Sequence, residues 1–200
     1  MTLRQKGIQD EAVLNAMHTV PRELFVLPDD MGSAYLDTAL PIESNQTISQ
    51  PYIVARMLEA AKVTGPFNKV LEVGVGSGYL AAILSYLAQE VYGIERVKIL
   101  YQIAQKRLQK LSRVNINLKL GDGYHVWPEK APFDAIIVSA TAPYIPTILI
   151  DQLKDGGRLV IPVQTQTHEE LQLITKKEDA YKKVLLDIVR FVPLKMGVER

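Results

Sequence analysis

The fold is decided by the stretch Val70-Leu71-Glu72-Val73-Gly74-Val75-Gly76-Ser77-Gly78-Tyr79. A short buried-type strand runs directly into three glycines at alternate positions, and an apolar helix is expected over residues 79–88. Glycines permit turns and a close backbone approach that a side chain would block. The helix presents free N–H groups at its start. Strand, glycine loop and helix in this order predict a ligand site of an open α/β fold.

Strands and helices alternate outward from this loop toward the C-terminus. Strands are expected at residues 91–94, 116–120, 133–139 and 158–163, and helices at 97–111 and 147–153. The last part of the chain is expected to form an antiparallel hairpin from residues 170–175 and 183–191. This order predicts a Rossmann-like α/β fold, with a mainly parallel central sheet, helices on both faces and an antiparallel edge.

The N-terminal part is expected to be helical with interruptions. Apolar residues recur at helical spacing up to Met17, and prolines then break the pattern. Residues 35–42 are expected to be extended. A helix is expected to begin at Pro51, with Ser49 as a candidate N-cap. We therefore expect one domain over residues 1–200, consisting of an N-terminal helical, substrate-covering segment (1–61), an α/β core (69–163) and a C-terminal hairpin (164–200).

The composition is that of an ordinary globular chain. Of the 200 residues, 48% are hydrophobic and 22% are charged, and the formal net charge is +1. So small a charge provides no global field toward nucleic acid or an anionic membrane. The absence of cysteine excludes disulfides and thiolate chemistry, and the three histidines lack metal-ligand spacing. With neither a signal-peptide pattern nor a membrane span, we expect a cytoplasmic monomer that binds no metal, nucleic acid or membrane.

The glycine spacing and the acidic Glu72 discriminate between a dinucleotide and S-adenosylmethionine as the ligand of this loop. A dinucleotide fingerprint has the pattern Gly-x-Gly-x-x-Gly or Ala, whereas here Gly78 is the fifth residue of the pattern and the bulky Tyr79 the sixth. Glu72 at the strand end would repel a pyrophosphate, but it would suit a ligand that carries an amino group. S-adenosylmethionine has a cationic amino acid portion and no phosphate. The loop therefore favours this methyl donor over NAD.

Two further acidic residues are expected at neighbouring strand ends. Glu95 follows Gly74 by about 20 residues and is placed to accept hydrogen bonds from ribose hydroxyls. Asp122 is placed to accept one from the adenine amine, with Gly123 giving room for the ring; the alternative for this segment is an ordinary turn. Because ligands of open α/β sheets bind at the carboxyl ends of the strands, these groups should line one cleft.

Segments over nearly the whole chain resemble the protein-L-isoaspartate O-methyltransferase family. These segments are residues 20–26, 39–42, 46–51, 71–79, 131–134 and 190–194. The glycine loop occurs in many methyltransferases, whereas Gln46-Thr47-Ile48-Ser49-Gln50-Pro51 is far more specific to this family. The resemblance implies a class I S-adenosylmethionine-dependent fold. It also implies methyl transfer to the free α-carboxylate of L-isoaspartyl residues in damaged proteins and peptides, which initiates repair through a succinimide.

The resemblance further implies roles for individual residues. Ser49 would aim one carboxylate oxygen at the methyl group, or it would only cap the following helix. A carboxylate is already ionised at neutral pH, so positioning and partial desolvation are the work left to the enzyme. The residues expected to hold the donor are Gln46, Thr47, Glu72, Gly74, Gly76, Ser77, Gly78, Glu95, Asp122 and Gly123. Those expected to flank the substrate are Tyr35, Asp37, Ala39, Ser139, Ala140, Ala142 and Pro143.

Some positions admit more than one interpretation. Asp37 would either aid substrate binding or cap local structure, while the small Ala140 and Ala142 suit an open cleft. The chain departs from the usual family residues at Asn45, Val75, Thr141 and Gln164. Asn45 tolerates a left-handed backbone, Val75 removes a hydroxyl beside the donor, and Thr141 would narrow the substrate cleft.

Two other functions stay open from the residues themselves. One is a methyltransferase of the same fold that acts on nucleic acid or a small molecule, although no Asn/Asp-Pro-Pro-Tyr-type motif follows the strand at 133–139. The other is a non-catalytic relative that only binds the donor.

Overall fold

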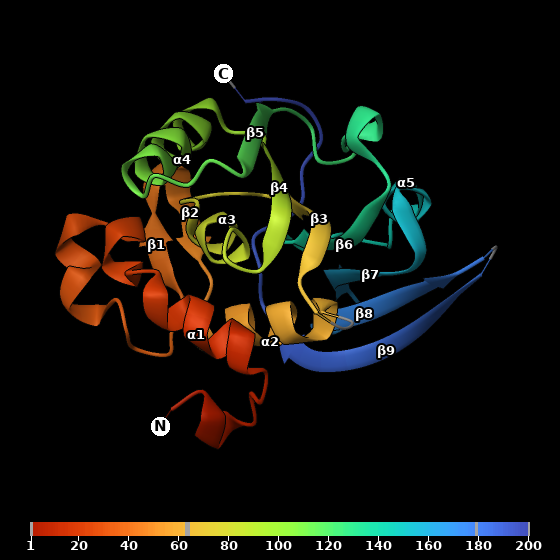
Figure 1. Ribbon diagram of the computed structural model, residues 1–200, viewed down its shortest axis with the longest axis horizontal. Helices are drawn as coiled ribbons and strands as arrows, with labels where there is room; N and C mark the ends of the chain where they lie inside the picture. The colour runs from red at the N-terminus through yellow and green to blue at the C-terminus, as the bar shows by residue number, and fades with distance from the viewer. Residues whose placement is uncertain (1, 63–64, 179, 200) are drawn as a thin grey trace.

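The computed structural model describes residues 2–62, 65–178 and 180–199. Within them a seven-stranded sheet has the order β5-β4-β3-β6-β7-β8-β9 (Figure 1). Its strands are β3 (Phe67–Val73), β4 (Ala88–Glu95), β5 (Ile116–Leu120), β6 (Phe133–Val138), β7 (Leu153–Gln164), β8 (Glu169–Lys177) and β9 (Ala180–Val189). The first five strands pair in parallel, and β8 and β9 add an antiparallel edge. The predicted sheet and terminal hairpin are confirmed.

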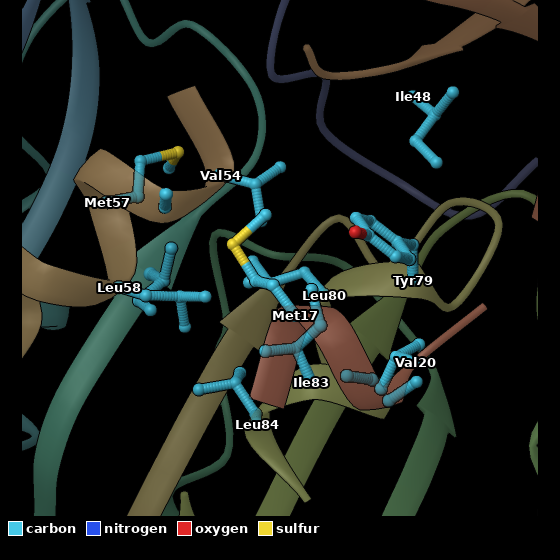
Figure 2. Close-up of a cluster of buried hydrophobic side chains, with 14 of the residues drawn as sticks. Met17, Val20, Ile48, Val54, Met57, Leu58, Tyr79, Leu80, Ile83 and Leu84 are labelled. Atoms are coloured by element: carbon cyan, nitrogen blue, oxygen red, sulfur yellow. The ribbon is translucent and has the colours of Figure 1, made fainter. Parts of the chain in front are cut away.

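The sheet separates two apolar clusters, because alternate side chains of each strand point to opposite faces. In β3, Val70 belongs to the larger cluster, while Leu71 and Val73 belong to the smaller one. The larger cluster is covered by α1 (Glu11–Thr19), α2 (Pro51–Ala61), α3 (Tyr79–Leu84) and α4 (Lys98–Lys110). Figure 2 shows side chains of α1, α2 and α3 gathered in this cluster. The smaller cluster is covered by α5 (Thr147–Asp151).

The helix after the glycine loop is shorter than predicted. It ends at Leu84, and the next strand already begins at Ala88. Ser85 ends the helix because its hydroxyl donates back to the Ala82 carbonyl at 2.6 Å, while its own carbonyl accepts hydrogen bonds from Arg113 and Asn115. By contrast, α2, α4 and β5 agree closely with the predicted ranges.

The N-terminal segment is helical with interruptions, as predicted. Besides α1 it contains short 3-10 turns, η1 (Arg4–Lys6), η2 (Arg22–Phe25), η3 (Pro28–Ser33) and η4 (Glu43–Asn45). The expectation of an extended segment over 35–42 holds only for β1 (Leu40–Ile42), which pairs antiparallel with β2 (Gln46–Ile48). Residues 35–38 turn instead, with the Thr38 amide bonded to the Leu36 carbonyl at 2.8 Å. Among the helices of the described ranges, none is both long and apolar enough to cross a membrane.

Candidate active site

A cavity of about 450 Å³ lies at the carboxyl ends of the central strands. The ends of β3 and β4 contribute residues 72–77 and 94–97, and the segment before α2 contributes residues 44–49. The chain leaves β3 toward β4 and later returns to β6 on its other side, so the cavity lies where an open α/β sheet binds its ligands. Its volume suits a small organic molecule.

The three glycines of the loop adopt left-handed backbone conformations, but two of them line the cavity and the third lies between two helices. Gly74 (φ 87°) and Gly76 (φ 54°) line the cavity together with Ser77. Gly78 (φ 93°) does not line it. A Cβ at Gly78 would lie 3.4 Å from the Cβ of Ala104 in α4. Gly78 therefore lets α3 and α4 pack closely, whereas the first two glycines bring backbone to the cavity.

Glu72 lies at the cavity with an unsatisfied carboxyl group. Its side chain is buried, and its Oε2 has no hydrogen-bond partner among the described residues. Burial, with the nearby charge of Glu95, raises the pKa of Glu72 well above its ordinary value. A buried acceptor without a partner is costly. A ligand that brings an ammonium group to Oε2 would remove that cost.

Glu95 is also buried at the cavity, and it holds the glycine loop in place. Its Oε2 accepts a hydrogen bond from the Gly76 amide and its Oε1 one from the Val97 amide, both at 2.8 Å. Burial raises the pKa of Glu95, while these backbone N–H groups oppose the rise. Each oxygen keeps a second lone pair, so the carboxylate can still accept from a ligand hydroxyl.

The predicted adenine contacts are divided between the cavity and the C-terminal segment. Gly123 lines the cavity, and a Cβ there would lie 2.5 Å from Cγ1 of Val73. Asp122 is not among the lining residues. Its Oδ1 accepts from the Tyr124 amide at 2.8 Å and its Oδ2 from the Gly197 amide at 2.6 Å. Asp122 therefore fixes the C-terminal segment beside the site.

That C-terminal segment contributes residues that the sequence did not reveal. Residues 192–195 and Glu199 line the cavity. Glu199 pairs with Arg96 at 2.8 Å, just after β4, and its backbone bonds to that of Arg96 and Lys98. Apart from the family-like 190–194 stretch, no local pattern marks these residues, because their partners lie about 50 to 100 positions earlier.

Ser49 faces the cavity and does not cap α2. Gln46, Thr47 and Ser49 all line the cavity. The N-cap position of α2 is Gln50, with no side-chain cap, so the alternative interpretation of Ser49 as an N-cap is wrong. Within the described residues no hydrogen bond uses the Ser49 hydroxyl, while the Ser49 carbonyl accepts one from Nη2 of Arg22 at 2.8 Å. The segment before it turns sharply at Asn45 (φ 55°), which agrees with the expected left-handed backbone.

Of the four residues of the loop after β6 that were predicted to flank the substrate, two line the cavity. Ser139 and Ala140 line the cavity, and Pro143 is exposed outside it. The prediction for Ala142 is wrong, because Ala142 has no exposed surface and its amide donates to the Pro162 carbonyl at 3.0 Å. Thr141 does not narrow the cavity either. It is buried and is not itself a lining residue, and its hydroxyl donates to Oε2 of Glu169 at 2.6 Å.

The remaining predicted substrate residues lie outside the cavity. Tyr35 is 66% exposed, and its hydroxyl donates to Glu23. Ala39 is exposed just before β1. Asp37 takes the capping role: its Oδ1 accepts from the Tyr52 amide at 2.8 Å, and its Oδ2 pairs with Lys6. Within the described ranges, no group of three or more metal-ligating side chains occurs.

Comparisons with known proteins agree with this geometry. The model of the protein-L-isoaspartate(D-aspartate) O-methyltransferase family matches residues 1–199. Protein-L-isoaspartate O-methyltransferases of Pseudomonas fluorescens and Parvibaculum lavamentivorans are 48% and 51% identical to the chain; the alignments cover 98% and 100% of this chain and 92% and 91% of theirs.

A solved structure from Plasmodium falciparum is also similar to nearly the whole chain. It is described as a protein-L-isoaspartate O-methyltransferase in complex with S-adenosyl-L-homocysteine. Its TM-score is 0.84 at 32% identity, over 96% of this chain and 94% of that one. The chain therefore belongs to the protein-L-isoaspartate(D-aspartate) O-methyltransferase family.

Proposed function

We propose that this protein transfers a methyl group from S-adenosylmethionine to the free α-carboxylate of L-isoaspartyl residues in damaged proteins and peptides. Membership of the family supports the reaction, and the product complex of the Plasmodium falciparum relative supports the donor. The observation in this chain that carries the proposal is the orphaned carboxyl group of Glu72 at the cavity. It matches the cationic amino group of this donor, whose approach would favour the ionised carboxylate.

The donor would be held by groups from several strand ends. Glu72 would bind its amino group, and the left-handed backbone at Gly74 and Gly76 would allow close approach of its methionine portion. Glu95 would accept from the ribose hydroxyls while it continues to hold the glycine loop. Gly123 would leave room for the adenine ring. Gln46, Thr47 and Ser77 line the same cavity and would complete the donor site.

The chain's own residues have a limited chemical task. The sulfonium of the bound donor supplies the electrophilic methyl group. The attacking carboxylate is ionised at neutral pH, so no base has to remove a proton. The free hydroxyl of Ser49 would donate a hydrogen bond to one carboxylate oxygen and direct the other toward the methyl group. Holding the groups in line and excluding water then lowers the barrier.

The acceptor would enter past Ser139 and Ala140, which line the cavity beside the glycine loop. The exposed Tyr35 and Ala39 would flank the peptide farther out. An enzyme that repairs many proteins must accept varied side chains. We therefore expect recognition of the peptide backbone, with little selectivity for neighbouring side chains.

The decisive experiment is a methylation assay with radiolabelled donor and a pair of matched peptides. The isoaspartyl peptide should yield a base-labile methyl ester, and the normal aspartyl isomer should yield none. Equal labelling of both peptides, or of neither, would refute the proposal. Labelling of RNA or of a small molecule instead would favour another methyltransferase of this fold. Donor binding without any turnover would identify a non-catalytic relative.

We also propose that residues 1–61, 69–163 and 164–200 act as one catalytic domain, and that the protein is a cytoplasmic monomer without a nucleic-acid partner. Residues from all three parts line the same cavity, which supports the single unit. The near-neutral net charge supports the lack of a nucleic-acid partner. Sedimentation analysis at micromolar concentration would test the monomer.

A further inference from the structure

The family-like segment Val20-Pro21-Arg22-Glu23-Leu24-Phe25-Val26 has no part in the function described so far. Arg22 is its most unusual residue, because this charged side chain is only 1% exposed. Its Nε donates to the Ala34 carbonyl and its Nη2 donates to the Ser49 carbonyl, both at 2.8 Å. The guanidinium thus joins the backbone of Ala34 to that of Ser49, the residue proposed to aim the nucleophile.

The same guanidinium also contacts the donor side of the site. Its Cζ lies 4.9 Å from the ring centroid of Tyr79, which begins α3 directly after the glycine loop. Phe25, from the same segment, packs on that ring with centroids 5.5 Å apart. Tyr79 itself lines the cavity. Arg22 therefore bridges Ser49 and the helix that follows the donor-binding loop.

Stability alone does not account for a cation at this position. No carboxylate in the described ranges lies within ion-pair distance of Arg22, and its Nη1 is buried without a partner. Burying an unpaired charge is unfavourable, and apolar side chains often replace such groups without loss of stability. A rigid planar group that binds two carbonyls and stacks on a ring is instead suited to fixing geometry.

We propose that Arg22 is a positioning residue for methyl transfer, which sets the place of Ser49 relative to the donor through the Ser49 carbonyl and the Tyr79 ring. A second contact acts just after Ser49, at the start of α2, because the Tyr52 amide donates a hydrogen bond to Oδ1 of Asp37 at 2.8 Å. Arg22 and Asp37 thus hold the two ends of residues 49–52. This inference rests on the proposed function and on the role proposed there for Ser49.

The first test is Arg22→Lys, which keeps the charge but removes the planar group that binds both carbonyls. Because a misplacement of about 1 Å can cost about 100-fold in rate, we expect kcat with the isoaspartyl peptide to fall about 10- to 100-fold. The donor Kd, measured by calorimetry, should change by less than about threefold, since the donor contacts are retained. An unchanged kcat, or a loss confined to donor binding, would overturn the proposal.

The chain provides a matched control at the opposite end of α2. Arg158 donates from Nη1 to the Ala60 and Lys62 carbonyls at 3.0 and 2.7 Å, and its buried Nε likewise has no partner within the described part of the chain. Arg158→Lys should destabilise the protein in a similar way, yet leave kcat within about twofold of the wild type. An equal loss of kcat in both variants would mean that Arg22 acts through general stability.

A double-mutant cycle with Ser49→Ala tests whether Arg22 affects kcat by positioning Ser49 or by stabilising the fold. If Arg22 acts through Ser49, Arg22→Lys should slow the Ser49→Ala enzyme by no more than about twofold. Additive losses, or full turnover by Ser49→Ala, would overturn this inference and leave the proposed function intact. A wild type inactive on the isoaspartyl peptide would overturn the proposed function as well. If Arg22→Lys does not fold, Arg22→Gln replaces it in the cycle. Failure of both to fold, while Arg158→Lys folds, would make Arg22 a stability residue and refute the proposal.

Discussion

Replacing Glu72 by Gln should weaken donor binding while it stabilises the free protein. The substitution keeps the size of the side chain and removes its charge. Among the described residues the Glu72 side chain accepts no hydrogen bond, and its Oε2 is buried, so the donor's ammonium group would give the carboxylate one charged hydrogen bond. Such a bond contributes about 1.5–3 kcal/mol, which corresponds to a loss of about 10- to 150-fold in donor affinity.

The effect on stability has the opposite sign and depends on pH. The pKa of Glu72 is raised by burial and by the charge of Glu95, so the folded protein retains a proton that the unfolded chain has released. The stability of the wild type therefore falls as pH rises from about 4.5, the ordinary value, through the raised pKa. Glu72→Gln lacks this contribution, so its Tm should exceed that of the wild type most clearly above this interval.

Binding of the donor should also be coupled to a proton. An ammonium ligand favours the ionised form of Glu72, so the wild type should release a proton as it binds and should bind more tightly as pH rises. Calorimetry in buffers of different ionisation enthalpy measures this release, which should be smaller in Glu72→Gln. Glu59→Gln is the control, because Glu59 binds the Gln9 and Asp10 amides outside the cavity lining. An unchanged donor Kd and an unchanged Tm in Glu72→Gln would refute this reasoning.

Three further substitutions test other parts of the site. Ser49→Ala removes one hydrogen bond to a charged nucleophile and should lower kcat about 10- to 100-fold, with an unchanged donor Kd in calorimetry; unchanged turnover would exclude the proposed role. Thr141→Ala removes the hydroxyl that donates to Glu169 at 2.6 Å. It should lower the free energy of unfolding in urea by about 1–3 kcal/mol without changing kcat, and a gain in kcat would show that Thr141 does narrow the cleft. Gly123→Ala would place a Cβ 2.5 Å from Val73 Cγ1 and should weaken donor binding about tenfold through a shifted cavity wall; wild-type affinity would contradict that geometry.

Much of the central sheet could be predicted because its signals are local. The strand at 133–138 stands out as a buried apolar run, and the strand at 116–120 as an alternation of apolar and polar residues. Their alternation with helices implies parallel pairing. The hairpin of β8 and β9 follows from two strand patterns separated by a polar turn. The end of α3 could not be predicted in this way. It depends on Ser85, whose carbonyl is held by Arg113 from 28 positions farther along.

In the candidate site, the positions of several residues could be predicted from the sequence, whereas their hydrogen-bond partners could not. Neighbouring parallel strands end at one edge of the sheet, and this alone predicts that the residues at their ends line one cavity. These residues are Glu72, Gly74, Gly76 and Glu95. Whether a polar side chain is free to meet a ligand is a different question. Asp122 is bound to the Gly197 amide, 75 positions away. Thr141 and Asp37 are likewise occupied by Glu169 and Tyr52.

The α/β order, the glycine loop after the first parallel strand and the acidic strand ends were therefore predictable, because they depend on backbone propensity and on residues close in the chain. The three-dimensional fold was needed to show that Glu72 and Ser49 line the cavity, and that their side chains have no hydrogen-bond partner among the described residues. It also decided that the C-terminal segment lines the cavity and that Arg22 joins Ser49 to Tyr79. Hydrogen-bond partners far apart in sequence meet only after folding, and no local pattern encodes which donors and acceptors they leave free.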